Sequence, residues 1–348
     1  MTNSMKRIAV IAVALALVAG PAVGGAVGGF NGPLFGLSTA PNGALLLADA
    51  STGVIPIRND IAGSAITLPG VTDISPVTNT VMWATTGAGE NPEEDTGQAL
   101  YQISRGQASM VANLYTFEAT SNPDGNDPFD SNPFDVQSLG SRSALVVDAG
   151  GNDLLRVSDR GQVRVLAVFP DSLVSTANLK SLAGCPEPGP FVFFCDFPAM
   201  MPAQSTPTSV AIGPDGYYYV GELRGFPAPT NASSIWRVSP RASWAQCGSS
   251  PDCVKVFDGG FTSIIDLAFG PDGNLYVAEL DEGSWAAVEI FQTPLGGTVS
   301  SCSLASLTCS DVATGLPMLT TITFGKDGSL WAAQNALIPG LAEVVQLP

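Results

Sequence analysis

The chain has 348 residues, a formal net charge of −17 and only 13% charged residues. Because binding to phosphate requires clustered Lys and Arg, this balance excludes a nucleic-acid-binding protein and docking on an anionic lipid surface. The sequence contains no histidine, which excludes Ser-His-Asp and Cys-His catalysis and metal sites with imidazole ligands. Carboxylate chemistry, hydroxyl chemistry and hard cations bound by oxygen are left, and neither a nucleotide nor a haem is expected.

The N-terminus resembles an export signal. Lys6 and Arg7 precede an apolar run, Ile8–Val18, and a stretch of small residues continues to Gly29. The apolar run is too short for a stable membrane anchor, although an uncleaved anchor is the alternative. Several positions would suit cleavage, namely Ala22, Gly24 and Ala26.

The expected organisation is therefore a signal peptide, residues 1–29 with an approximate cleavage site, and one domain, residues 30–348. The domain would be secreted, periplasmic or at the cell surface, with no stable membrane span after cleavage. Gly (38 residues) and Pro (27 residues) are abundant without a collagen period, as in an all-β protein with many turns.

A short phrase recurs six times along this domain, and each copy is typical of a strand, a tight turn and a second strand. An Asp-Gly or Asn-Gly pair in the clearest copies supplies the positive φ of a hairpin turn. The copies begin at Gly36, Thr72, Phe134, Thr208, Ile264 and Thr320. Repeats of about 50 residues predict an all-β, six-bladed β-propeller of four-stranded antiparallel blades. Ring closure is expected to need a strand from one terminus, without the sequence showing which.

The cysteines form three close pairs in the sequence, each inside one insertion between repeats. We expect local disulfides within them: Cys185 with Cys195, Cys247 with Cys253, and Cys302 with Cys309. Six cysteines allow 15 connectivities, so spacing alone does not decide the pairing. The spacings are not those of a CxxC metal site.

Acidic residues recur at two positions of the aligned repeats. Four follow the second strand of a hairpin: Asp49, Asp148, Glu222 and Glu279. Three lie at the opening of the first strand: Asp73, Asp135 and Asp266. Because the first strand of a hairpin begins beside the end of the second, all seven are expected at one edge of the sheets, at one mouth of the central channel.

Crowded carboxylates raise one another's pKa unless a cation neutralises them, and oxygen ligands favour Ca²⁺. A Ca²⁺ site at the channel mouth is therefore one interpretation. The candidate ligands are Asp73, Asp135, Asp148, Glu222, Asp266 and Glu279. The alternative is that these acids accept backbone N–H bonds at strand ends and solvate the rim.

A further acidic segment, "NPDGNDPFDSNP", carries Asp124, Asn126, Asp127 and Asp130. It lacks the spacing and the terminal Glu of an EF-hand loop. We expect an ordered loop shaped by Asx turns, with an independent Ca²⁺ site as the alternative.

Several phrases resemble the ScyD/ScyE family of exported propellers. They include "VVDAGGNDLLRV" at Val146–Val157, "PTSVAIGPDGYYYVGELRGFP" at Pro207–Pro227 and "IIDLAFGPDGNLYVAEL" at Ile264–Leu280. The GPDG turn is shared with NHL-repeat and SMP-30/gluconolactonase-like propellers. The resemblance to SMP-30-like enzymes implies a divalent cation at the channel mouth and lactone hydrolysis, with Asp266 and Asp135 at equivalent positions. The Asn ligands of that pattern have no counterpart at Ser209 or Thr321.

Three functions are consistent with these features. The first is an exported binding or scaffold protein without catalysis of its own, holding a small molecule, glycan or protein on a propeller face. The second is a divalent-cation-dependent lactonase or hydrolase, in which Glu222 or Glu279 would act as the base. The third is a subunit of an extracellular assembly, which an exposed apolar stripe would support.

Overall fold

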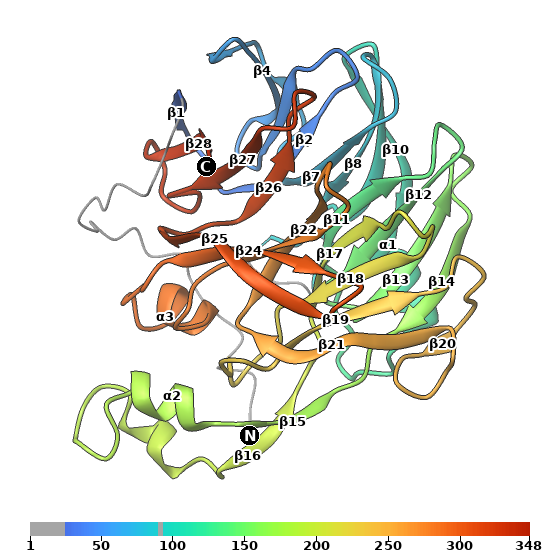
Figure 1. Ribbon diagram of the computed structural model, residues 1–348. Coiled ribbons are helices and arrows are strands. Elements are labelled where there is room, and N and C mark those ends of the chain that lie inside the picture. The colour runs from blue at the N-terminus through green and yellow to red at the C-terminus, as the bar shows by residue number, and fades with distance from the viewer. Residues whose placement is uncertain (1–24, 90–92) are drawn as a thin grey trace.

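The computed structural model describes residues 25–89 and 93–348, and its strands form a six-bladed β-propeller (Figure 1). In each blade the chain runs outward from an innermost strand at the central channel. The first blade contains β2 (Leu34–Thr39), β3 (Leu45–Asp49), β4 (Gly53–Arg58) and β5 (Ile61–Ala62). The short strand β6 (Ile66–Thr67) also pairs with β4. The second contains β7 (Val71–Pro76), β8 (Val81–Thr86), β9 (Ala99–Ser104) and β10 (Gln107–Asn113).

The remaining blades repeat this order. The third contains β11 (Pro133–Ser138), β12 (Ser143–Asp148), β13 (Asp153–Ser158) and β14 (Val163–Val168), with the short β20 (Ala245–Gln246) beside β14. The fourth contains β17 (Pro207–Ile212), β18 (Tyr218–Glu222), β19 (Ser233–Val238) and β21 (Cys253–Phe261). The fifth contains β22 (Ile264–Phe269), β23 (Leu275–Glu279), β24 (Gly297–Ser303) and β25 (Thr308–Leu316).

The sixth blade closes the ring with a strand from the N-terminal end of the described chain. Its strands are β26 (Thr321–Phe324), β27 (Leu330–Gln334), β28 (Ala342–Gln346) and, outermost, β1 (Ala26–Phe30). β1 is antiparallel to β28, with Ala26 opposite Val345. Most of the expected leader, residues 1–24, lies outside the described residues, but a domain boundary at residue 30 would divide β1.

The repeated hairpins form where the Asp-Gly pairs predict them. Gly216 and Gly273, in the turns after β17 and β22, have φ angles of +78° and +81°, which residues with a Cβ rarely adopt. Apolar side chains cover both faces of the inner strands, so neighbouring blades pack face to face. Trp83 of β8, for example, is fully buried in a cluster with Val146 of β12. Burial of apolar surface between blades therefore holds the ring together.

The innermost strands share an irregularity at their beginning. In five blades the pairing with the second strand skips one residue near the channel, as between Pro133 and Asp135. Such a β-bulge changes the direction of the neighbouring side chains. The skipped residue is Phe35, Thr72, Phe134, Thr208 or Ile265.

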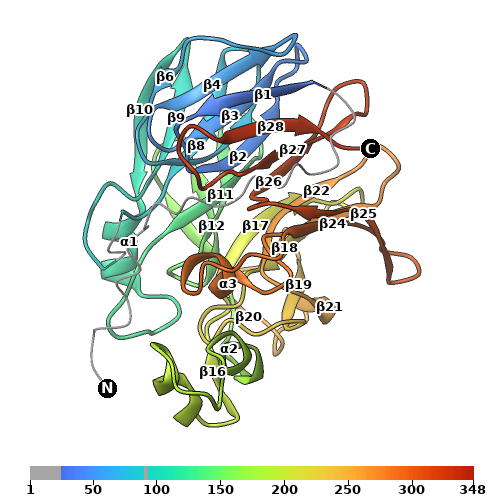
Figure 2. The ribbon, with the colours of Figure 1, turned by 90° about the vertical axis from the view of Figure 1, so that its left-hand side faces the viewer.

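The helices and the longest insertion lie where innermost strands begin and second strands end. These elements are α1 (Leu114–Ser121), α2 (Ala177–Leu182), α3 (Trp285–Glu289), the 3₁₀ turn η1 (Val192–Asp196) and the hairpin of β15 (Ser172–Ser175) and β16 (Met200–Ala203). We call this side of the propeller the loop face. The insertion with α2 and β16 is at the bottom of Figure 2. No helix among the described residues is long and apolar enough to cross a membrane.

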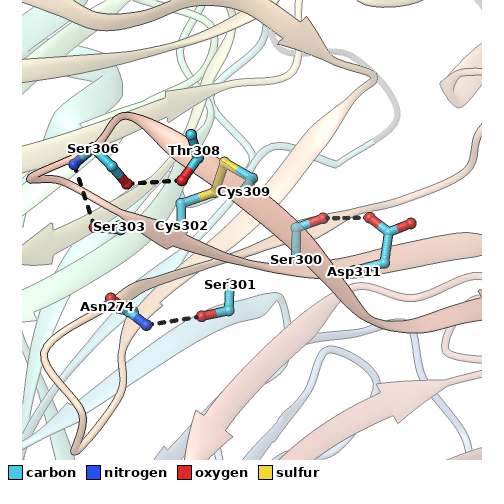
Figure 3. Close-up of a disulfide and its surroundings, with 9 residues drawn as sticks. All are labelled: Asn274, Ser300, Ser301, Cys302, Ser303, Ser306, Thr308, Cys309 and Asp311. Atoms are coloured by element: carbon cyan, nitrogen blue, oxygen red, sulfur yellow. Dashed lines mark hydrogen bonds between the residues drawn. A yellow bond between two sulfur atoms is a disulfide. The ribbon is translucent and has the colours of Figure 1, made fainter.

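The three local disulfides are confirmed, joining Cys185 to Cys195, Cys247 to Cys253 and Cys302 to Cys309. The last joins directly opposite residues of β24 and β25, beside a hydrogen bond from the Ser300 hydroxyl to Asp311 (Figure 3). The first lies inside the 172–203 insertion, whose Phe194 packs in a small apolar cluster with Phe226 and Phe291 of other loops. The disulfides therefore stabilise hairpins and an insertion rather than contacts between distant blades.

Candidate functional site

The central channel contains a cavity of about 410 Å³ that is lined by the innermost strands of all six blades. Asp73, Asp135 and Asp266 line it, and each is half-buried. Apolar and aromatic side chains share the wall, among them Phe269 and Phe324. No Lys or Arg is among the described residues that line this cavity, and the titratable groups there are carboxyls.

Each of the three channel aspartates also joins its blade to the next one. Asp73 accepts a 3.1 Å hydrogen bond from the backbone N–H of Val136. Asp135 accepts one of 2.6 Å from Val210. In each pair, donor and acceptor lie on the innermost strands of consecutive blades. A carboxyl bonded in this way stabilises the ring while it faces the channel.

The electrostatic environment favours protons on these carboxyls. Burial raises the pKa of Asp73 well above its usual value, and the neighbouring Asp135, which shares a hydrogen bond with it, raises it further. Burial and then Asp135 raise the pKa of Asp266 to about 8, against hydrogen bonds from Ile322, Thr321 and Leu267 that lower it. The channel wall therefore offers both hydrogen-bond donors and acceptors at neutral pH.

Asp73, Asp135 and Asp266 occupy the same position of their repeats, which we call the aspartate position. The residue just before this position alternates between two kinds of side chain around the ring. The second, fourth and sixth blades carry threonines whose hydroxyls donate to carbonyls at the start of the next innermost strand. The bonds run from Thr72 to Pro133 (2.9 Å), from Thr208 to Ile264 (2.6 Å) and from Thr320 to Leu34 (2.5 Å). These bonds tie the blades together on the loop-face side of the cavity.

The first, third and fifth blades carry Phe35, Phe134 and Ile265 at that position. The rings of Phe35 and Phe134 lie 5.2 Å apart, although the second blade separates their strands along the ring. Their contact therefore crosses the interior of the channel. Neither ring lines the cavity, so the aromatic pair lies between the cavity and the loop face.

The four acids at the ends of second strands do not line the cavity, so only Asp73, Asp135 and Asp266 of the seven predicted acids meet there. Asp49, Asp148 and Glu279 accept backbone N–H bonds from the loops beside them. The donors are Asn31 and Ser51 for Asp49, Asn132, Gly150 and Gly151 for Asp148, and Thr262 for Glu279. Burial raises the pKa of Asp148, and raises that of Glu279 to about 7.

Glu222 lies in a fully buried ion pair with Arg224. The Glu222 carboxylate also accepts hydrogen bonds from Ser205 Oγ (2.7 Å), the Ser234 N–H (3.0 Å) and Trp236 Nε1 (3.0 Å). Both carboxylate oxygens therefore already have partners inside the fourth blade. Glu222 therefore holds Arg224 and its loop in place. It does not line the cavity, where a catalytic base would have to lie.

The residues present do not form a ready-made metal centre in the channel. Within residues 25–89 and 93–348, no three Asp, Glu or Cys side chains are grouped so that they could hold one ion. Asp73 and Asp135 each accept a hydrogen bond from a backbone N–H of the next blade, so one oxygen of each carboxyl already has a partner. No step of a mechanism is therefore assigned to a channel metal.

The fold and this channel define the class: the chain is a six-bladed β-propeller. It is similar to a glucose dehydrogenase-like putative oxidoreductase of Thermus thermophilus, with a TM-score of 0.55 and 15% identity over 94% of this chain and 99% of the other. An aldose sugar dehydrogenase of Escherichia coli has a TM-score of 0.53 and 12% identity over 93% and 99%. A streptogramin B lyase has a TM-score of 0.51 and 13% identity over 93% and 97%. At such identities these similarities show the fold alone.

No protein-family model matches the sequence, and no curated protein matches it. The activity is therefore argued from the site itself.

The sequence did not predict that the alternating threonines, or the pair of Phe35 and Phe134, would lie at the channel. Their shared position was visible in the sequence, because all six residues occupy the same position of the aligned repeats. Their alternation becomes meaningful only when the repeats are arranged in a ring and the bulge is known. Glu118 and Asp153 were not predicted from the sequence either.

Proposed function

We propose that this protein is an exported propeller that binds a small, hydroxyl-rich molecule, such as a unit of a glycan, in its central channel without catalysis of its own. The observation that carries this proposal is the combination of three carboxyls with Phe269 and Phe324 along one cavity of about 410 Å³. This volume lies within the usual range of ligand pockets. Carboxyls bind hydroxyl groups through hydrogen bonds, and aromatic rings pack on the C–H faces of sugars.

Electrostatics support a neutral or cationic ligand over an anionic one. The chain has a net charge of −17, and no basic side chain lines the cavity. Burial raises the pKa of Asp73, Asp135 and Asp266, and a protonated carboxyl both donates and accepts hydrogen bonds. An acidic sugar or a phosphate would find no basic side chain among the residues that line the cavity.

Export is proposed on two features. The three disulfides are typical of proteins that fold in an oxidising compartment, and residues 1–29 have the pattern of a signal peptide. Since β1 begins at Ala26, cleavage after Ala22 or Gly24 would leave that strand intact. Membership of the ScyD/ScyE family is part of the same proposal, on the motif at Val146–Val157.

Binding can be tested by saturation-transfer NMR of the mature protein with glucose, glucosamine and glucuronate as neutral, cationic and anionic probes. Thr323 lines the cavity, so Thr323→Trp would fill part of it. Thr308→Trp, on the exposed hairpin of β24 and β25, is the matched control. We expect binding of the first two sugars, loss with Thr323→Trp and retention with Thr308→Trp. Equal signals from both variants, or none from the wild type, would overturn the proposal.

A hydrolase of the SMP-30/gluconolactonase type is the alternative, and the hydrogen-bonded pair of Asp73 and Asp135 favours it. Two neighbouring carboxyls with raised pKa values can supply the groups that general acid and base catalysis require. A screen of lactones and esters, with Asp135→Asn as the inactive control, distinguishes this alternative from binding alone.

An assembly subunit is supported by a different observation. The 172–203 insertion carries four large apolar side chains that are 44–65% exposed: Leu173, Val192, Phe193 and Met200. Light scattering of the mature protein, compared with Phe193→Ser, tests whether this surface joins copies of the chain.

A further inference from the structure

Two acids face each other outside the channel, at the loop-face end of the third blade. Asp148 ends β12 and Asp153 begins β13, and the two are directly opposite in the ladder. Residues opposite each other project from the same face of a sheet, where two like charges destabilise the pair. In the first, second and fifth blades the residue opposite the end of the second strand is Gly53, Ala99 or Thr298, and in the sixth blade Glu343 is opposite the uncharged Gln334.

Only one of the two carboxylates has hydrogen-bond donors. Asp148 accepts from the Ser131 hydroxyl at 2.7 Å as well as from the backbone N–H groups of Gly150 and Gly151. Asp153 is fully buried, and neither of its oxygens accepts a hydrogen bond from any residue that the structure describes. Asp153 is therefore a buried carboxyl without compensation inside the protein.

The helix α1 brings a third carboxyl to this place. Glu118 is 1% exposed, and both of its oxygens also lack a donor among the described residues. Its carboxyl lies against the turn between Asp148 and Asp153, where a Cβ on Gly151 would come within 3.0 Å of Glu118 Cδ. The glycine of this turn thus allows the Glu118 carboxyl to approach the pair of aspartates.

The end of the same helix adds a neutral oxygen. Asn122 follows Glu118 by one turn and donates its backbone N–H to the Glu118 carbonyl at 2.8 Å. Its side-chain Nδ2 donates to the Asn126 carbonyl at 2.9 Å, whereas its Oδ1 is buried without a donor. Asp124, in the Asx turn expected here, accepts from the N–H of Asn126 and holds this loop in place.

Among the residues that the structure describes, no basic side chain forms a hydrogen bond with these oxygens. Burial first, and then the neighbouring Asp148, Asp124 and Asp130, raise the pKa of Glu118 to about 9. Burial also raises the pKa of Asp153 well above its usual value, followed by the effects of Glu118, Asp148 and Asp124. Every charged group that shifts these two pKa values is another acid.

We propose that a Ca²⁺ ion binds between α1 and the turn that joins β12 to β13, held by the carboxylates of Glu118 and Asp153 and by Oδ1 of Asn122. Carboxylate and amide oxygens are the ligands that Ca²⁺ prefers, and backbone carbonyls or water complete its coordination. The site uses two acids rather than three, and its charge would compensate the buried carboxylates. It joins the helix between the second and third blades to the third blade, and it shares no residue with the channel cavity.

The test measures Ca²⁺ binding to the mature protein after EDTA treatment, by calorimetry and by thermal melting. We expect one Ca²⁺ per chain and a rise in Tm of roughly 4–8 °C at saturation. Glu118→Gln and Asp153→Asn preserve the side-chain shapes, and each should weaken binding more than about 10-fold. Asp266→Asn in the channel and Glu187→Gln on the surface should bind as the wild type does.

Two outcomes would overturn the proposal. If Asp266→Asn abolishes binding while Glu118→Gln retains it, the ion belongs to the channel. If the wild type binds no Ca²⁺, and Glu118→Gln melts at the same or a higher temperature in EDTA, the buried acids are simply protonated. Circular dichroism in EDTA confirms that each variant is folded before either result is read.

Discussion

Asp266, on the innermost strand of the fifth blade, accepts a 2.7 Å hydrogen bond from the backbone N–H of Ile322, on the innermost strand of the sixth. The Asp73 and Asp135 carboxyls contact Val136 and Val210 of the next blades in the same way. The carboxyls that give the channel its chemistry therefore also hold the ring. Substitutions at these positions must be measured for stability as well as for binding.

The threonine bonds between blades should contribute to stability. Thr208→Val preserves the side-chain shape but removes the hydroxyl that donates to the Ile264 carbonyl at 2.6 Å. Because that carbonyl is left without its buried partner, we expect a loss of about 1–2 kcal/mol in the free energy of unfolding. Urea unfolding measures it, with Thr323→Val as the control because Thr323 faces the cavity. Equal losses in both variants would show that the bond between blades is unimportant.

Stability should depend on pH through the channel carboxyls. The pKa of Asp266 is about 8 in the folded protein, against a usual value of 3.8. Between these values the folded state holds a proton that the unfolded chain has lost, so the stabilisation present at low pH is lost as the pH rises toward 8. Asp266→Asn should flatten this decline, measured by urea unfolding in EDTA at pH 5 and pH 8. An unchanged decline would argue against the raised pKa.

Gly36 occupies the aspartate position of the first blade, and any larger residue should strain the ring there. A Cβ at Gly36 would lie 2.6 Å from Asp73 Cα and 2.8 Å from the Thr72 carbonyl oxygen. Since backbone atoms cannot move aside easily, Gly36→Ala should cost about 1–3 kcal/mol. Gly189→Ala, which meets nothing within 4 Å, is the control in thermal melting. A Gly36→Ala variant as stable as this control would contradict the packing described.

Glu222 should act in stability rather than in metal binding. Glu222→Gln leaves the buried guanidinium of Arg224 without its counter-charge, for which we expect a loss of about 3–5 kcal/mol. The exposed Glu187→Gln change is the control in urea unfolding. A Glu222→Gln protein that keeps its stability but loses bound Ca²⁺ would restore Glu222 as a metal ligand.

Much of the candidate site could be predicted from the sequence. The sequence did not show that the acids divide into those that line the cavity and those bonded to loops at the ends of second strands. The repeat alignment placed Asp73, Asp135 and Asp266 in one column, and the structure brings these three to one cavity. The same alignment gave no reason to separate them from Glu222, whose partner Arg224 lies in the following loop. The opposition of Asp148 and Asp153 was implicit in the hairpin, whereas the approach of Glu118 was not, because a helix carries it there.

The sequence by itself determined the features that depend on neighbours along the chain. The turn residues, the alternating strands and the six repeats are of this kind, because a tight turn brings its flanking residues together whatever surrounds them. Close spacing predicted the three local disulfides, and the structure decided this pairing among the 15 connectivities. Only the tertiary structure decided that β1 pairs with β28, that Phe35 meets Phe134 across the channel, and which carboxyls lack partners. These contacts depend on how whole blades pack around the ring, and burial between the blades sets that packing.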